Sequence, residues 1–393
     1  MASVFKRGSS WLIKWKDSNG KWRTCSGGKD KTTAKQISTQ RELESRKLAE
    51  GLISETELQL RDARRTGITD HVSAWYDQLL ARGNTTKHAT LSRTRVLRLI
   101  EGCGFKNLTE VTAEKVNQWL ADRRQADTSK RGFSSQTSNF YLTCFKSFLN
   151  WCAKTDKLSK NPVAYLNGIN VKTDRRHDRR NLSQDEMRRL IEAARASNDT
   201  YRGMTGEDRA LLYQLTSQTG LRASELKSLT VASFRLNDKP SVTVQAAYAK
   251  NKKQSELPLR QDTAEVLAKR FKNRMPAAKA FNLPNADNIC DLIIHDLAIA
   301  RQAWLLEATT VKEKRDRDQS DFLKYKDSHG RYADFHSLRH TFISEMAIRG
   351  VHPKIAQQLA RHSSITLTLD RYTHVNQEDM LEAVNRLPEI KAG

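Results

Sequence analysis

Apolar and polar residues alternate over the first 26 positions, and the spacing of apolar residues then changes to that of helices. The apolar positions of one early run are Trp11, Ile13 and Trp15. Alternation with period two is typical of a half-buried strand, and the Asn19-Gly20 pair that follows is a hairpin signal. Helix-forming polar residues then extend from about 33 to 52. We expect a small sheet packed by one helix over residues 1–62.

Four amphipathic helices are predicted between residues 69 and 164, where apolar residues recur with a period of 3.6. The apolar positions in these four groups are Val72, Trp75 and Leu79; Val96, Leu97 and Ile100; Val116, Trp119 and Leu120; and Tyr141, Cys144, Phe145, Phe148 and Cys152. Asn161-Pro162 ends the last helix, because the proline ring cannot continue it. We expect a four-helix domain over residues 66–166.

Residues 167–180 contain few apolar side chains and much positive charge, so they cannot build a core and are predicted to be a basic linker. The segment either lies along a duplex and lets the protein close as a clamp, or it is a flexible tether. Ser183 and Glu186 then form a capping box ahead of helically spaced apolar residues. This start predicts a third domain over residues 181–393.

The chain is strongly basic. Its 393 residues include 68 Lys and Arg against 45 Asp and Glu, giving a formal net charge of +23 and a pI near 9.9. Such a field attracts polyanions in a salt-dependent manner, so double-stranded DNA is the expected partner. No apolar run approaches the ~20 residues of a spanning helix. Without a secretion signal or paired cysteine spacing, a reducing cytoplasm is expected, with association to the bacterial nucleoid when DNA is bound.

Six residues in the second half form an ordered set suited to cleaving a phosphodiester bond. Three local patterns contain five of them: Thr219-Gly220-Leu221-Arg222-Ala223-Ser224-Glu225-Leu226; His336-Ser337-Leu338-Arg339-His340; and His362-Ser363-Ser364 with Tyr372 ten residues on. The sixth, Lys250, lies between two strand-like runs. Each pattern alone is a weak signal, but their order resembles that of the tyrosine recombinases, the phage-integrase family, from about residue 181 to 375.

This resemblance implies a mainly α fold with small β-sheets (α+β). It would contain a small N-terminal sheet domain, a helical core-binding domain and a mixed α/β catalytic domain. The implied activity is site-specific DNA strand transfer through a 3′-phosphotyrosyl intermediate, without metal, cofactor or ATP. A homo-tetramer on DNA, a monomer in free solution and accessory DNA-bending proteins are the implied partners. The rival interpretations are a relaxing topoisomerase with the same site and a non-enzymatic basic DNA-binding protein.

The six residues supply a nucleophile, phosphate donors and a proton source. Arg222 and Arg339 present planar forks of charged donors that can pair two phosphate oxygens, and the family's acidic residue at Glu225 supports them. His336 and His362 are further phosphate donors, and Tyr372 is the nucleophile. The resemblance makes Lys250 the general acid for the 5′ oxygen, although Lys252 and Lys253 are close alternatives.

Two local features leave alternatives open. His336 and His340 stand four apart and could bind zinc, but the sequence lacks the Glu of an HExxH site and places an Arg between them. Family members usually have Gly before the histidine that corresponds to His362, whereas this chain has Arg361, which could add a DNA contact. The apolar stripe of the 376–393 tail could pack in its own domain or on a neighbouring protomer.

The candidate DNA-backbone contacts are basic residues of the first two domains and the linker. Those of the N-terminal sheet, which would bind accessory arm DNA if it is more than a folding unit, are Lys14, Lys16, Lys21 and Arg23. Those of the helical domain are Lys87, Arg93, Arg95, Lys130 and Arg131, and those of the linker are Arg175, Arg176, Arg179 and Arg180. Residues 303–329 are highly charged, and we expect a helix followed by a surface loop.

Overall fold

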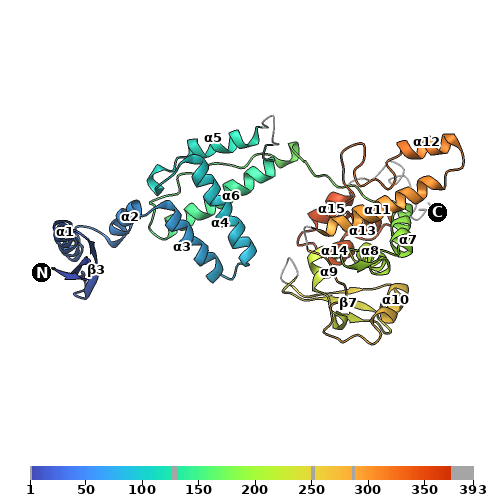
Figure 1. Cartoon of the computed structure of the whole chain (residues 1–393), viewed down its shortest axis with the longest axis horizontal. Coiled ribbons are helices and arrows are strands. Elements are labelled where there is room, and N and C mark those ends of the chain that lie inside the picture. Colours follow the sequence, from blue (N-terminus) through green and yellow to red (C-terminus); the bar gives the residue numbers. More distant parts are fainter. Residues whose placement is uncertain (1, 126–131, 249–252, 286–287, 373–393) are drawn as a thin grey trace, which may run out of the picture. The chain divides into compact units, whose positions relative to one another are not determined.

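The computed structural model describes the chain apart from residues 1, 126–131, 249–252, 286–287 and 373–393. The described residues fall into two compact units, Met1–Arg176 and His177–Gly393. Both are mostly helical and contain small antiparallel sheets, which confirms the predicted α+β class (Figure 1). No helix within the described ranges is long and apolar enough to cross a membrane.

The first unit begins with the predicted sheet and helix. Its elements are β1 (Ser3–Arg7), β2 (Ser10–Lys16), β3 (Trp22–Gly28) and α1 (Lys31–Ala49). The strands pair antiparallel in the order β1-β2-β3. Ile13 is fully buried and lies next to Gly27 of β3. A Cβ added to Gly27 would lie 2.7 Å from the Cβ of Ala34 in α1, so the helix packs directly on this glycine. One face of the sheet is therefore closely covered by α1.

A helical bundle completes the first unit. Its helices are α2 (Glu55–Arg65), α3 (Ile68–Ala81), α4 (Thr86–Cys103), α5 (Ala113–Arg124) and α6 (Ser135–Lys154), with the 3₁₀ turn η1 (Leu108–Glu110). Helices α3 to α6 are the four that the sequence predicts, and α2 is additional. The bundle core includes Trp75 and Phe148, whose rings meet edge to face with centroids 5.7 Å apart.

The second unit is built around α8, which contacts both α7 and α13 (Figure 1). The last element of the first unit is the 3₁₀ turn η2 (Val171–Thr173). The first elements of the second unit are α7 (Gln184–Ala196), β4 (Thr200–Tyr201), β5 (Met204–Thr205), α8 (Gly206–Thr219), α9 (Ala223–Ser228) and the 3₁₀ turn η3 (Val231–Ser233). The predicted capping box of Ser183 and Glu186 starts α7. Buried Leu190 of α7 and Leu212 of α8 belong to the continuous core of this unit.

A second three-stranded sheet and three helices extend this unit. They are β6 (Phe234–Arg235), β7 (Ser241–Val244), β8 (Ser255–Pro258), α10 (Gln261–Phe271), α11 (Ile289–Leu306) and α12 (Val311–Gln319). Strands β7 and β8 pair antiparallel, with Val244 opposite Ser255. The two strand-like runs around Lys250 are thus neighbours in one sheet. Helix α12 and the irregular chain after it match the helix and loop expected in the charged segment.

The last described helices are α13 (Ser337–Ile348), α14 (Pro353–Ala360) and α15 (Thr366–Tyr372). Each of the three contacts the other two. Helices α13 and α14 pack against each other through a small apolar cluster. It consists of Ile343 and Met346 from α13 and Ala356 and Ala360 from α14. This packing brings the end of α14 next to α13, and α13 itself lies against α8.

Basic residues of the predicted linker are bonded within each unit. In the first unit, Arg176 donates to the carbonyl oxygens of Gly132 (2.5 Å) and Phe133 (2.9 Å). In the second, Arg179 pairs with Asp334 at 2.8 Å, and buried Arg180 pairs with Glu186 at 2.9 Å. These arginines therefore form ion pairs and hydrogen bonds within the protein, which the composition of the linker did not predict.

Candidate active site

The end of α8 places Arg222. Helix α8 stops at Gly220, whose φ of +60° is a left-handed conformation that favours glycine, and α9 begins two residues after Leu221. Space also restricts this position, because a Cβ on Gly220 would lie 2.5 Å from Cδ1 of Phe342. Arg222 therefore occupies the short connection between two helix ends, and its side chain is about a quarter exposed.

Glu225 is a buried carboxylate shared by two arginines. Its Oε1 accepts a hydrogen bond from Nη1 of Arg222 at 2.9 Å, and its Oε2 accepts from the backbone N–H of Arg222 at 2.8 Å. Nη2 of Arg361 lies 3.0 Å from Oε2. The side chain of Glu225 is 1% exposed and that of Arg361 is 6% exposed. A carboxylate withdrawn from water is stabilised here by two charge-assisted contacts.

Arg339 of α13 is hydrogen-bonded to the ends of two other helices. Its Nη1 donates to the carbonyl oxygen of Gly220 and its Nη2 to that of Ala360, so the ends of α8 and α14 are tied to α13. Burial lowers the pKa of Arg339 to about 9, and the positive charges of Arg222 and Arg361 act in the same direction. The guanidinium nevertheless stays charged at neutral pH.

His336 lies at the N-terminal cap of α13, one turn before Arg339. Burial lowers the pKa of His336 to about 4, and the positive charges of Arg179 and Arg339 act in the same direction. The imidazole is therefore neutral at pH 7. Asp334, two residues earlier, accepts hydrogen bonds from the backbone N–H of Ser337 at 3.0 Å and from Arg179 and His177. These bonds fix the start of the helix that positions His336 and Arg339.

His362 follows α14 directly. The helix ends with Arg361 at φ +55°, and the backbone N–H of His362 donates to the carbonyl of Gln357 at 3.0 Å. The imidazole Nδ1 lies 2.9 Å from Oγ1 of Thr368 in α15, and Thr368 is fully buried. If Nδ1 accepts from that hydroxyl, the ring's Nε2 is left as the donor.

Two of the six predicted residues have no described side chain. Tyr372 is the last residue of α15, so its backbone belongs to the helix that contacts both α13 and α14. Lys250 and its alternative Lys252 lie outside the described residues, in the connection between β7 and β8. The structure thus brings together Arg222, Glu225, Arg339, Arg361 and the loop leading into His362.

Histidine rings alone do not define a metal centre here. The rings of His336 and His340 meet edge to face with centroids 5.1 Å apart. Within the described ranges, no group of three or more His, Cys, Asp or Glu side chains is arranged to hold a metal ion.

The basic residues of the N-terminal sheet that were predicted to contact DNA lie on different surfaces of the sheet. Lys14 and Lys16 are exposed on the face opposite Ile13, and their ammonium groups lie 5.0 and 5.4 Å from the ring centroid of Trp22. Arg23 is instead paired with Asp17 at 2.8 Å. Lys21 is exposed just before β3. The open face of the sheet thus combines two lysines with an indole that is 47% exposed.

The predicted contacts of the helical bundle are described only in part. Lys87 and Arg93 are exposed on α4, while the guanidinium of Arg95 stacks over Phe140 at 4.8 Å. Lys130 and Arg131 lie outside the described residues. In the linker, Arg175 is exposed, whereas Arg176, Arg179 and Arg180 make ion pairs with carboxylates.

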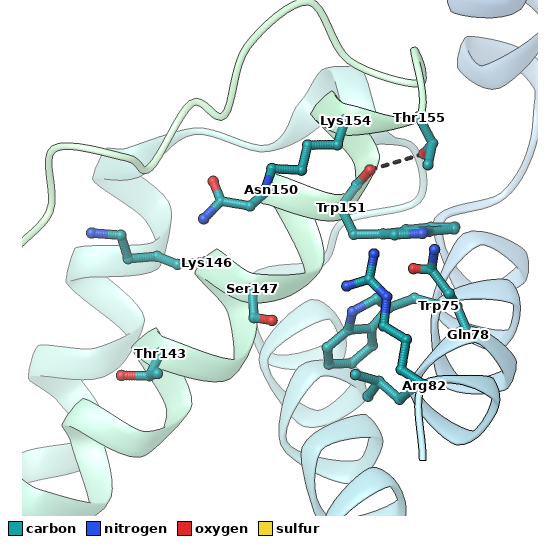
Figure 2. A pocket seen from close by; sticks show the side chains of 11 residues that line it. Trp75, Gln78, Arg82, Thr143, Lys146, Ser147, Asn150, Trp151, Lys154 and Thr155 are labelled. Carbon is teal, nitrogen blue, oxygen red and sulfur yellow. Dashed lines mark hydrogen bonds between the residues drawn. The ribbon is translucent and has the colours of Figure 1, made fainter. Parts of the chain in front are cut away.

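A cavity of about 670 Å³ in the bundle contains basic residues that sequence reasoning missed (Figure 2). It lies between α3 and α6, with Trp75 and Trp151 as apolar walls. Its basic lining residues are Arg82, Lys146 and Lys154. Lys146 donates to the carbonyl oxygen of Leu166 at 2.8 Å, so it also fixes the chain after α6. On α6 these lysines are interleaved with the apolar positions of the core, which hid them in the sequence.

At the junction of α8, α13 and α14, arginines held by a buried carboxylate lie with the neutral imidazole of His336, a donor set that defines the class of protein: an enzyme that handles a phosphodiester. Residues 180–379, just over half of the chain, match the model of the phage integrase family. The chain belongs to this family and is a tyrosine-type site-specific recombinase.

Individual relatives are distant in sequence. The chain is 24% identical over 291 residues to the tyrosine recombinase XerC of Thermodesulfovibrio yellowstonii, covering 72% of this chain and 85% of that protein. It is 22% identical over 296 residues to the transposase from transposon Tn916 of Enterococcus faecalis, covering 73% of this chain and 69% of that protein.

Solved structures share the fold. The integrase of transposon Tn1549 in complex with a circular intermediate DNA superposes with a TM-score of 0.56 at 17% identity, covering 81% of this chain and 99% of that one. A lambda integrase dimer bound to a COC′ core site gives a TM-score of 0.55 at 15% identity, covering 99% and 97% of the two chains.

Proposed function

We propose that this recombinase cleaves and rejoins double-stranded DNA through a 3′-phosphotyrosyl intermediate formed by Tyr372. The observation that supports this most is the convergence of Arg222 and Arg339, which are far apart in sequence, at Gly220. Glu225 holds one donor of the Arg222 guanidinium. Within the described part of the chain, the other donors of that fork remain for a phosphate.

In the proposed reaction, the phenolic oxygen of Tyr372 releases its proton to solvent and bonds to phosphorus, while the bond from phosphorus to the 5′ oxygen breaks and that oxygen takes a proton from Lys250. Arg222 and Arg339 stabilise the negative charge that builds on the non-bridging oxygens, with His336 and His362 as further donors. Such preorganised donors are worth on the order of 10² to 10³ in rate each. The phosphotyrosyl ester keeps the bond energy, so attack by a free 5′ hydroxyl rejoins DNA without ATP.

The test is replacement of the nucleophile alone. Tyr372→Phe removes only the attacking oxygen, so we expect the covalent protein–DNA adduct to disappear while site binding changes by less than about twofold. The adduct is measured on a denaturing gel with a nicked duplex taken from the DNA that borders the gene. An adduct that persists in Tyr372→Phe would contradict the assignment. A wild-type protein that binds DNA and never forms an adduct would instead favour a non-enzymatic DNA-binding protein.

The N-terminal sheet is proposed to bind accessory arm DNA through the open face that contains Lys14 and Lys16. Paired with the exposed indole of Trp22, these lysines combine phosphate attraction with a flat apolar surface. A protein lacking residues 1–62 should still cleave a minimal core site but lose arm binding. Loss of core cleavage by the folded, shortened protein would contradict this division of roles.

The remaining basic candidates are proposed to contact the DNA backbone around the core site. Lys87, Arg93 and Arg175 are exposed, and the proposal extends to Arg95, Lys130 and Arg131. Removing one such contact should reduce the salt dependence of binding by about one phosphate equivalent, a slope near 0.9 in log affinity against log salt. Arg180 should give no such change, because it is buried against Glu186.

We further propose that the protein assembles as a tetramer on DNA, is a monomer without it, and acts in the cytoplasm on nucleoid DNA, where bending proteins can assist. Lambda integrase, which shares the fold, has been solved as a tetramer bound to a Holliday junction. Sedimentation with and without a four-way junction built from the protein's own sites tests this. A free tetramer, or a monomer on the junction, would contradict it.

A further inference from the structure

Arg361 occupies an unusual backbone position at the site. It caps α14 with φ +55° and ψ +42°, a left-handed conformation that glycine adopts freely and that an L side chain adopts at a cost. Its side chain is not released into solvent but turned inward, where it is 6% exposed. Such strain persists only where surrounding contacts hold the residue in place.

Those contacts are with Glu225 and with the end of α8. Nη2 of Arg361 lies 3.0 Å from Oε2 of Glu225 and 3.4 Å from the carbonyl oxygen of Gly220. The other carboxylate oxygen of Glu225 holds Nη1 of Arg222. One buried carboxylate therefore bridges two guanidinium groups, of which Arg222 is the more exposed.

The ion pair with Glu225 is the main contact of the Arg361 guanidinium. Nε and Nη1 of Arg361 are buried and have no hydrogen-bond acceptor among the described residues. Within these ranges Glu225 is the carboxylate that pairs with the Arg361 charge, so the position of the Arg361 guanidinium and that of the carboxylate depend on each other. Removing Arg361 would take the cation away from Oε2 and leave it with the backbone N–H of Arg222, so that Glu225 could shift and pair with the Arg222 guanidinium in a bidentate manner.

We infer that Arg361 is a positioning residue for strand cleavage: by holding Glu225 in place, it keeps the Arg222 guanidinium aimed at the scissile phosphate. The inference rests on the proposed function of Arg222. A direct contact of Arg361 with DNA is the competing role, and it predicts a different result in the experiment below.

The experiment is a double-mutant cycle on the rate of adduct formation. Arg361→Gly, Arg222→Ala and the double variant are compared with wild type in single-turnover cleavage of the nicked duplex, at saturating protein. Arg361→Gly should slow cleavage by roughly tenfold with little change in DNA affinity, since coupled neighbours commonly interact at that level. In the Arg222→Ala background, the same change should slow cleavage by less than about twofold, because there is no longer an Arg222 to position.

Controls separate positioning from loss of structure. Glycine suits the left-handed backbone of residue 361 and Glu225 keeps Arg222 as a cationic partner, so Arg361→Gly should still unfold cooperatively, at a melting temperature lowered by the loss of one buried ion pair. Arg361→Lys keeps a charge that can reach Glu225 and should restore part of the rate; it also serves if the glycine variant does not fold. Arg349→Ala removes a surface arginine paired with Glu345 at the end of α13 and should leave the rate unchanged.

Two results would overturn the inference: equal slowing by Arg361→Gly with and without Arg222, which indicates an independent contact, or a wild-type rate in folded Arg361→Gly and Arg361→Lys. Both are distinct from failure of the proposed function, which an adduct in Tyr372→Phe would reveal.

Discussion

Three guanidinium groups, those of Arg222, Arg339 and Arg361, lie around the single carboxylate of Glu225. The first two could be selected from the sequence, because the order of the motifs that contain them resembles that of the tyrosine recombinases. Arg361 could only be noted as a departure from glycine. Its role depends on a left-handed backbone and on the packing of α14 against α13, neither of which local sequence determines.

At the residue scale, the lowered pKa of His336 makes stability depend on pH. The folded state holds this imidazole neutral down to about pH 4, whereas an unfolded histidine takes up a proton near pH 6.5. Between these values the unfolded state binds more protons, so stability falls as the pH falls. His336→Gln should lose less stability than wild type on going from pH 7 to 5, by about 2 kcal/mol. Denaturant unfolding at both pH values measures this, and parallel losses would contradict it.

Lys250 gives a second prediction at this scale, because a general acid matters only for a leaving group that needs a proton. Lys250→Ala should slow cleavage by about 10² or more on ordinary DNA but be close to wild type on a 5′-thio substrate, since sulfur leaves unprotonated. Lys253→Ala and Lys252→Ala are the matched controls and should show no such rescue. Rescue at either control would move the acid to that residue.

Among the elements, helices with a clear apolar stripe and a recognisable end were predictable. The positions of α6 and α7 follow from apolar spacing and a capping box. Helix α2 was not predicted because its sequence is dominated by charged residues and only Ala63 is buried. Its capping box of Ser54 and Glu57 was the available signal.

The end of α8 yields a prediction about an element boundary. Gly220→Ala should destabilise the protein by about 2 to 4 kcal/mol, from the left-handed backbone together with overlap between the new methyl group and Phe342. Gly350→Ala is the control, because Gly350 has φ +67° but nothing within 4 Å of an added Cβ, so only the backbone cost applies. Thermal unfolding compares them. Equal losses would mean that the contact with Phe342 does not matter.

On the scale of the whole molecule, the net charge of +23 indicated DNA as the partner, but it could not separate structural arginines from available ones. Arg179 and Arg180 were predicted to be part of a charged linker, and both are paired with buried carboxylates of the second unit. Partners more than a hundred residues away, such as Asp334, cannot be found from local composition.

These pairs predict where the catalytic unit must begin. A fragment starting at residue 177 keeps Arg179 and Arg180, whereas one starting at 181 leaves Asp334 and Glu186 without their cations. Loss of one partner from a buried pair costs about 3 to 5 kcal/mol, so the shorter fragment should melt at a clearly lower temperature. Indistinguishable melting of the two fragments would show that the pairs add nothing to folding.

The pairing of Arg179 with Asp334 also has a mechanical consequence. Asp334 caps the first turn of α13, the helix of Arg339, and the same carboxylate holds the first residues of the second unit. A pull on the chain ahead of His177 would therefore reach the start of that helix through these side chains and through the backbone bonds of residues 178–180 to Tyr332. A load on that start would act on the position of His336, which caps the same helix.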